Sequence, residues 1–161
     1  MDEERRTLLE RKRKQLKAAT EARARAALIA DVIAELDARG IKYQLEFVDT
    51  SWEWVRDHFP VTSWGGIDWT LATRKIQFNW ESEEQRPQLL KEIIKIAGLD
   101  DEPVVVIWSN ADRPAVLMPL ADVESVASSL FDQDFDTWII SKTSRWCIES
   151  HHNGTFGIVL D

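Results

Sequence analysis

The pattern of apolar and polar positions separates an N-terminal helical segment from a longer part in which strands and helices alternate. Residues 3–38 are rich in Ala, Glu, Arg, Lys and Leu and lack Gly and Pro, which predicts one long helix ending at Gly40. Its second half has an apolar face at helical spacing, formed by Ile29, Val32, Ile33 and Leu36. Its first half has few large apolar residues among many charges, so we expect those turns to project into solvent, fray or pack on a partner chain.

Further along the chain, alternating or unbroken apolar runs predict strands, and helical spacing recurs between some of them. Strands are expected at residues 41–48, 74–80, 104–108, 115–118, 137–141, 145–150 and 155–159. Capping boxes at Thr50 and Ser82 predict a helix after each of the first two strands, and a further helix is expected after Leu120. Adjacent strands without a helix between them favour antiparallel pairing. The expected fold class is α+β: a largely antiparallel sheet with helices packed on it, preceded by a long N-terminal helix.

Charge is unevenly distributed between these two parts. The formal net charge is −8; residues 1–40 contain ten Lys/Arg and eight Asp/Glu, whereas residues 41–161 contain ten Lys/Arg and twenty Asp/Glu. We therefore divide the chain into an N-terminal charged helix, 1–40, and an acidic α+β domain, 41–161. Because an acidic body repels nucleic-acid backbones and attracts basic partners, we expect no nucleic-acid ligand.

Cysteine usage and hydropathy indicate a cellular compartment. Cys147 is the only cysteine, which excludes an internal disulfide and fits a reducing environment. The charged N-terminus has no apolar signal-peptide core, and no apolar run is long enough to span a bilayer. We therefore expect a cytoplasmic protein with no membrane partner.

One acidic cluster has the composition of a cation site. Asp132, Asp134 and Asp136 form a D-x-D-x-D run, and their carboxylates are ligands that Mg²⁺ and Ca²⁺ prefer. However, Thr137 and Thr143 stand where a calcium-binding EF-hand loop needs Gly and Glu. The run is better explained as a solvated acidic connection or as the rim of a protein-binding surface.

The remaining reactive side chains give no recognisable site. His151 and His152 are adjacent, and neighbours in a strand point to opposite faces, so we expect turn histidines and no metal site. Cys147 lies within an apolar strand pattern, which predicts a small buried core residue. No phosphate-binding loop, hydrolase elbow or zinc-protease motif occurs. We predict no metal, no cofactor and no catalytic residue.

Three segments in the C-terminal third resemble immunity proteins of bacterial polymorphic-toxin and contact-dependent growth inhibition systems. They are V-V-V-I-W-S-N-A-D-R-P (104–114), D-T-W-I-I-S (136–141) and R-W-C-I-E-S-H-H-N-G-T-F-G (145–157). The resemblance implies a non-catalytic protein that binds a cognate toxin, often a nuclease, and occludes its active site. The acidic body agrees with this, because nuclease toxins carry basic substrate clefts.

Three functions remain open from the sequence. The first is an immunity protein that binds a toxin with a basic surface through acidic and aromatic side chains. Its expected binding residues are Asp100, Asp101, Glu102, Asp132, Asp134, Asp136, Trp54 and Trp64. The second is a small hydrolase-like enzyme with a carboxylate/His site, using Asp134, Asp136, Glu149 and His151. The third is an adaptor, or a homo-oligomer, that assembles through the N-terminal helix.

Overall fold

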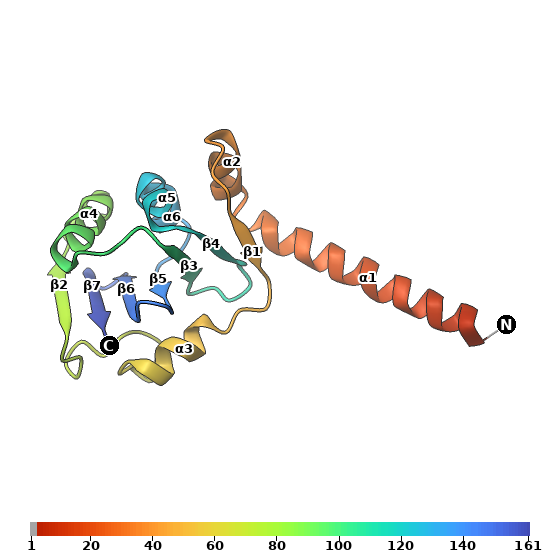
Figure 1. Ribbon diagram of the computed structural model, residues 1–161, viewed down its shortest axis with the longest axis horizontal. Coiled ribbons are helices and arrows are strands. Elements are labelled where there is room, and N and C mark those ends of the chain that lie inside the picture. The colour runs from red at the N-terminus through yellow and green to blue at the C-terminus, as the bar shows by residue number, and fades with distance from the viewer. Residues whose placement is uncertain (1–2) are drawn as a thin grey trace.

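A computed structural model describes residues 3–161, so the first two residues of the predicted N-terminal segment lie outside the described residues (Figure 1). The helices are α1 (Glu3–Ala27), α2 (Ala30–Ala38), α3 (Ser51–His58), the 3-10 turn η1 (Glu83–Gln85), α4 (Arg86–Ala97), α5 (Leu120–Ser125) and α6 (Ala127–Phe131). The strands are β1 (Gln44–Glu46), β2 (Lys75–Asn79), β3 (Pro103–Trp108), β4 (Ala115–Pro119), β5 (Thr137–Ser141), β6 (Trp146–His151) and β7 (Thr155–Leu160).

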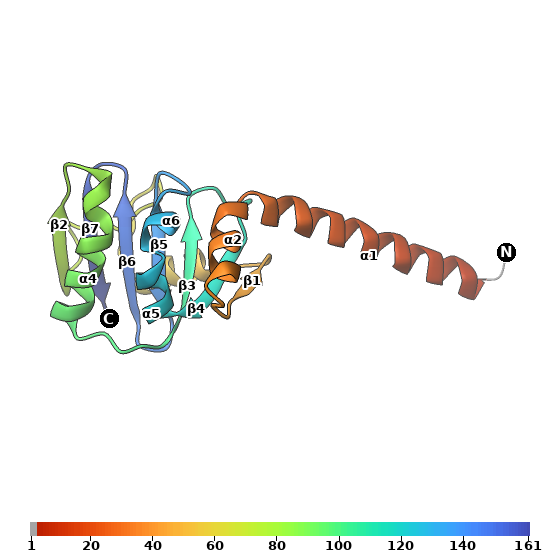
Figure 2. The same ribbon diagram turned by 90° about the horizontal axis from the view of Figure 1, so that it is seen from above.

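All seven strands form one sheet in the order β1-β4-β3-β5-β6-β7-β2, and every pairing is antiparallel. Helices α2, α4, α5 and α6 cover one face, while α3 and the segment that follows it cover the other (Figures 1 and 2). Side chains alternate between the two faces along each strand, so β3, β5 and β6 supply an apolar core to both. The α+β fold class with a long leading helix is confirmed.

Helix α1 extends away from the sheet, and none of its side chains is buried (Figure 1). The prediction of one continuous helix over residues 3–38 is wrong, because the chain turns at Leu28 and Ile29 before α2 begins. The turn lets Ile29 enter the core with no exposed surface, while Leu28 remains 43 % exposed. Helix α2 then packs on the sheet with the other helices. The division of the chain at residue 40 stays a prediction.

Other expected elements differ in length or in their ends. The strand predicted over residues 41–48 pairs with β4 only through Gln44–Glu46, since it is an edge strand with one neighbour. The helix expected after Leu120 is broken at Val126, whose backbone leaves helical geometry while its side chain stays buried. Thr50 makes no side-chain cap, whereas the capping box at Ser82 forms. Within residues 3–161, no helix is both long and apolar enough to cross a membrane.

Candidate functional site

A cavity of about 540 Å³ opens on the α3 face, at the end of the sheet where β3 finishes and β5 begins. Its walls come from the C-terminal turn of α1, the segment before α3, α3 itself, the β3–β4 turn and the start of β5. The side chains on which the argument below depends are Arg25, Trp52, Trp64, Arg113, Asp136 and Trp138. The cavity therefore joins charged and aromatic groups from distant parts of the sequence.

Trp64 lies at the tip of a short loop on the wall of this cavity. Val61 and Ile67 form an antiparallel bridge that closes the loop, and the Thr62 N–H donates to the carbonyl of Gly66 at 2.8 Å. Trp64 is 81 % exposed, which is unusual for so large an apolar side chain. A backbone-bonded loop that holds an exposed tryptophan beside a cavity has the features of an interaction hot spot.

A buried carboxylate holds that loop on the sheet. Glu149, on β6, accepts hydrogen bonds from the backbone N–H of Ile67 (2.8 Å) and from the indole N–H groups of Trp69 (2.9 Å) and Trp138 (2.7 Å). Burial raises the pKa of the Glu149 carboxyl, while these three donors and nearby His151 act in the opposite direction. Both oxygens of Glu149 are bonded within the fold, so its role here is to position the Trp64 loop.

Arg25 connects the end of α1 to the cavity wall. Its guanidinium donates to the carbonyl oxygens of Phe47, Ala111 and Asp112, and it stacks over the Phe47 ring with 5.5 Å from Cζ to the ring centroid. These contacts join the segment before α3 to the β3–β4 turn. Arg25 therefore fixes the direction in which α1 leaves the body.

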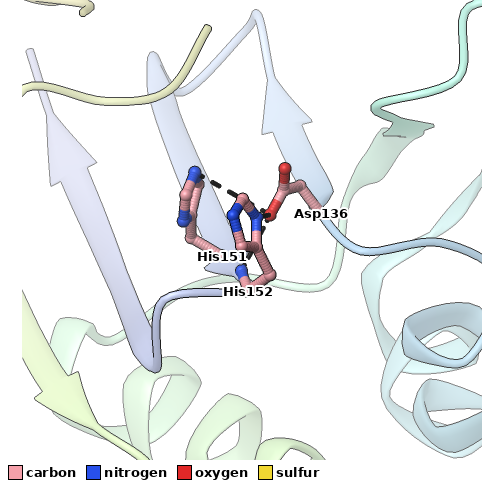
Figure 3. Close-up of side chains that lie close together, drawn as sticks. All are labelled: Asp136, His151 and His152. Atoms are coloured by element: carbon pink, nitrogen blue, oxygen red, sulfur yellow. Dashed lines mark hydrogen bonds and ion pairs between the residues drawn. The ribbon is translucent and has the colours of Figure 1, made fainter. Parts of the chain in front are cut away.

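Asp136, His151 and His152 meet beside the cavity (Figure 3). The His152 Nδ1 lies 2.8 Å from the Asp136 Oδ1, and the His151 Nε2 lies 3.8 Å from the same oxygen. The expectation that the two histidines point to opposite faces is wrong, because their rings stack with centroids 4.3 Å apart. The reason is that His151 ends β6 and His152 already belongs to the turn, where strand alternation stops.

The acidic residues among the predicted binding residues fall into two groups at opposite ends of β3. Asp100, Asp101 and Glu102 precede β3, whereas the aspartates from Asp132 to Asp136 precede β5, which pairs with the far end of β3. In the first group, Asp101 accepts from the Ala121 N–H, and Glu102 accepts from the Ser144 hydroxyl.

The second group is largely bonded within the fold. Asp132 pairs with Arg86 at 3.0 Å, and Asp134 pairs with Arg113 at 3.2 Å. Asp136 is 7 % exposed. The structure therefore places Asp136 on the cavity wall, whereas Asp132 and Asp134 form ion pairs with arginines.

The two predicted tryptophans have different surroundings. Trp64 lines the cavity, whereas Trp54 packs on Phe59 and stacks on His58 with ring centroids 4.2 Å apart. Sequence reasoning did not identify Arg25 or Arg113 as site residues, because neither differs from its neighbours in any local pattern. Trp52 packs on Trp138 with ring centroids 4.9 Å apart and also lines the cavity.

Residues 43–159 match the family described as "CdiI immunity protein EcoliA0-like". The chain belongs to this family of CdiI immunity proteins. The resemblance to contact-dependent growth inhibition immunity proteins is thereby confirmed, and the protein is a toxin-neutralising immunity protein that binds a cognate toxin. No curated protein matches the chain.

The match covers the strands that hold the cavity and the Trp64 loop, and it begins after α1 and α2. The family-defining part of the chain is therefore the sheet with α3 to α6. Helices α1 and α2 lie outside the matched region.

Proposed function

We propose that this CdiI immunity protein neutralises its toxin without catalysis, in the cytoplasm of the producing cell, and that the toxin docks on the cavity face. The single observation that carries the proposal is Trp64, a tryptophan that is 81 % exposed, held by a bonded loop beside a cavity of about 540 Å³. Tryptophan is enriched among the few residues that carry most of the binding energy at protein interfaces.

Other exposed side chains extend the same face. Val48 lines the cavity and is 91 % exposed, and Phe135 is 77 % exposed beside His152. Asp49 and Glu53 also line the cavity and add negative charge around the apolar groups. Arg25 and Arg113 also line the cavity, but Arg113 is paired with Asp134, and the acidic side chains of the lining outnumber the basic ones. Such a surface is complementary to a partner that combines apolar groups with Lys or Arg.

The partner class that fits this charge is a nuclease toxin. Residues 41–161 contain an excess of ten acidic side chains, and a nuclease cleft is basic because it binds phosphate. A complex formed in this way covers the catalytic cleft and prevents nucleic acid from entering it. Association with the toxin should then slow as salt concentration rises, because exposed charges are screened.

The test measures binding of the toxin domain encoded next to the gene for this chain. We expect Trp64→Ala to weaken binding by about 30-fold or more, which corresponds to about 2 kcal/mol at a hot spot. Leu71→Ala is the matched control, since Leu71 is 67 % exposed and does not line the cavity. Equal binding by the Trp64→Ala variant and the unaltered chain would contradict the proposed docking face.

A second pair of variants distinguishes the two acidic ends of the sheet. Glu53→Lys changes the cavity rim, whereas a combined Asp100→Lys and Asp101→Lys change alters the opposite end of β3. We expect the first to lower the association rate with the toxin more than the second does. The reverse order would contradict the proposed docking face and would indicate that the toxin binds at the Asp100 end of the sheet. The proposal that this chain binds a toxin would still hold.

A further inference from the structure

The meeting of Asp136, His151 and His152 at the end of the sheet suggests a second kind of site. We infer that these three side chains bind a divalent transition metal of the zinc class. Each offers one ligand atom, namely a carboxylate oxygen and two imidazole nitrogens, and all three atoms lie within 4.8 Å of one another (Figure 3). Two imidazoles with one carboxylate form a donor set that suits Zn²⁺ and its neighbours better than Mg²⁺ or Ca²⁺.

Two of the distances between ligand atoms are close to those around a tetrahedral metal. Metal–ligand bonds of about 2.0–2.2 Å place the ligand atoms of a tetrahedral site about 3.4 Å apart. The two separations from the Asp136 Oδ1 are 2.8 Å to His152 Nδ1 and 3.8 Å to His151 Nε2. One of these must widen and the other must shorten by roughly half an ångström. The two imidazole rings, which stack with centroids 4.3 Å apart, must also turn so that both nitrogen lone pairs point at the metal, and rotation of the exposed His152 side chain supplies this.

The backbone holds these ligands in place before any metal binds. The pairing of Thr137 with Ser150 sets Asp136 and His151 beside each other at the ends of β5 and β6. The backbone N–H of His152 donates to the Asp136 Oδ1 at 2.8 Å, which orients the carboxylate. The side chains of Asp136 and His151 are only 10 % and 12 % exposed, whereas that of His152 is 59 % exposed and leaves a path from solvent.

Metal binding requires each imidazole to offer a lone pair at the atom that faces the metal. Without metal, the His152 Nδ1 bonds to the Asp136 carboxylate, and the His151 Nδ1 accepts from the Asn153 N–H at 3.3 Å. On binding, the ring proton of His152 moves to Nε2 and that of His151 moves to Nδ1, so the long contact with Asn153 is lost. Each coordinating imidazole nitrogen is therefore unprotonated in the metal-bound state.

Three protein ligands leave a fourth position open on a tetrahedral metal. Because Asp136 also lines the cavity, that position lies at the margin of the surface that carries Trp64. A water molecule, or a side chain from a docked partner, has the chemistry to fill it. The metal site does not depend on toxin docking, and its test uses the metal alone.

The experiment titrates Zn²⁺ into the chelator-treated full chain and measures binding by calorimetry and by competition with a chromogenic indicator. We expect one tightly bound ion, and a loss of more than about 100-fold in affinity for His152→Ala, since even supporting residues around a metal contribute 10–100-fold. Because His152 is largely exposed, this variant should keep its fold. Co²⁺ in place of Zn²⁺ should give the visible absorption of a tetrahedral, four-coordinate site, and the His152→Ala variant should not show this absorption.

The matched control is His58→Ala, which removes the one remaining histidine; it lies on α3, where it stacks on Trp54. The control should bind Zn²⁺ as the unaltered chain does. The inference is overturned if the unaltered chain binds no ion, if His152→Ala binds as tightly, or if His58→Ala loses affinity equally. Asp136→Asn gives an independent check, because it keeps the size of the side chain and removes its charge.

Discussion

Removing the carboxylate of Glu149 should be among the most damaging single changes in the molecule, because it leaves several donors unpaired. The Glu149→Ala variant deprives Ile67 N–H and Trp138 Nε1 of their acceptor, and both residues are buried. A buried donor left without a partner costs about 1–3 kcal/mol. Part of this is offset because the variant no longer buries a charge. We therefore expect the free energy of unfolding to fall by about 2–4 kcal/mol.

The isosteric variant separates charge from shape. In Glu149→Gln, the amide oxygen can keep the bonds to Ile67 and Trp138, but the amide NH₂ then faces the half-buried indole N–H of Trp69. One donor of the three loses its acceptor, so we expect a smaller loss of about 1–2 kcal/mol. Glu84→Gln, at an exposed site in η1, is the control and should change stability by less than about 0.5 kcal/mol.

The assay is urea unfolding followed by tryptophan fluorescence, with equal m-values required before stabilities are compared. The expected order of destabilisation is Glu149→Ala, then Glu149→Gln, then the control. If Glu149→Ala were as stable as the control, the three hydrogen bonds would not hold the Trp64 loop, and the account of the site would be wrong.

The raised pKa of Glu149 adds a pH dependence with a defined sign. Burial lifts this pKa above its ordinary value of 4.5 in the folded chain, so the folded state binds the proton more tightly than the unfolded state does. The contribution of Glu149 to stability should therefore fall as pH rises from 4.5 to the raised value. Measured against Glu149→Gln over this interval, the stability advantage of the unaltered chain should shrink with rising pH. A flat difference would contradict the direction of the shift.

Three further predictions concern other parts of the chain. Cys147 is fully buried, and burial raises the pKa of its thiol well above the usual range, so a thiol reagent should label it only after unfolding. Gly157→Ala should cost about 1–3 kcal/mol in urea unfolding, because an added Cβ would lie 2.5 Å from the ring of Trp69. Removing residues 1–20 should leave stability within about 0.5 kcal/mol, since no side chain of α1 is buried. Sedimentation equilibrium of this truncated chain beside the full chain tests self-association, which is removed as a hypothesis if both are monomers.

Local patterns were sufficient to predict most of the sheet. Unbroken β-branched residues mark β3, and the alternation and turn signals of the last three strands appear as the β5–β6–β7 meander. The capping box at Ser82 also depends on neighbouring residues alone. Predictions of this kind are correct because the residues that form each feature lie close together in the sequence.

The predictions that were wrong concern features that depend on contacts between residues far apart in the sequence. The break between α1 and α2 comes shortly after Arg25, whose guanidinium donates to the carbonyl oxygens of Phe47 and Ala111. The composition of residues 3–38 does not indicate these distant partners. The stacking of His151 on His152 depends on where β6 ends. Trp64 was predicted to bind the partner because it is aromatic, which stays a prediction, whereas the cavity beside it depends on the fold.

Strand β6 contributes one residue to each of the two proposed sites: Glu149 holds the Trp64 loop, and His151 belongs to the metal site. Glu149 and His151 are two residues apart on this strand, so both face α3, yet each supports a different structure. Glu149 bonds to the loop that carries Trp64, and its loss acts on stability because its partners are buried. Trp64 itself is exposed, so its loss should reduce toxin binding with little effect on folding. A variant that weakens binding and stability to the same degree therefore indicates a disturbed loop, whereas a loss of binding alone identifies a direct contact with the toxin.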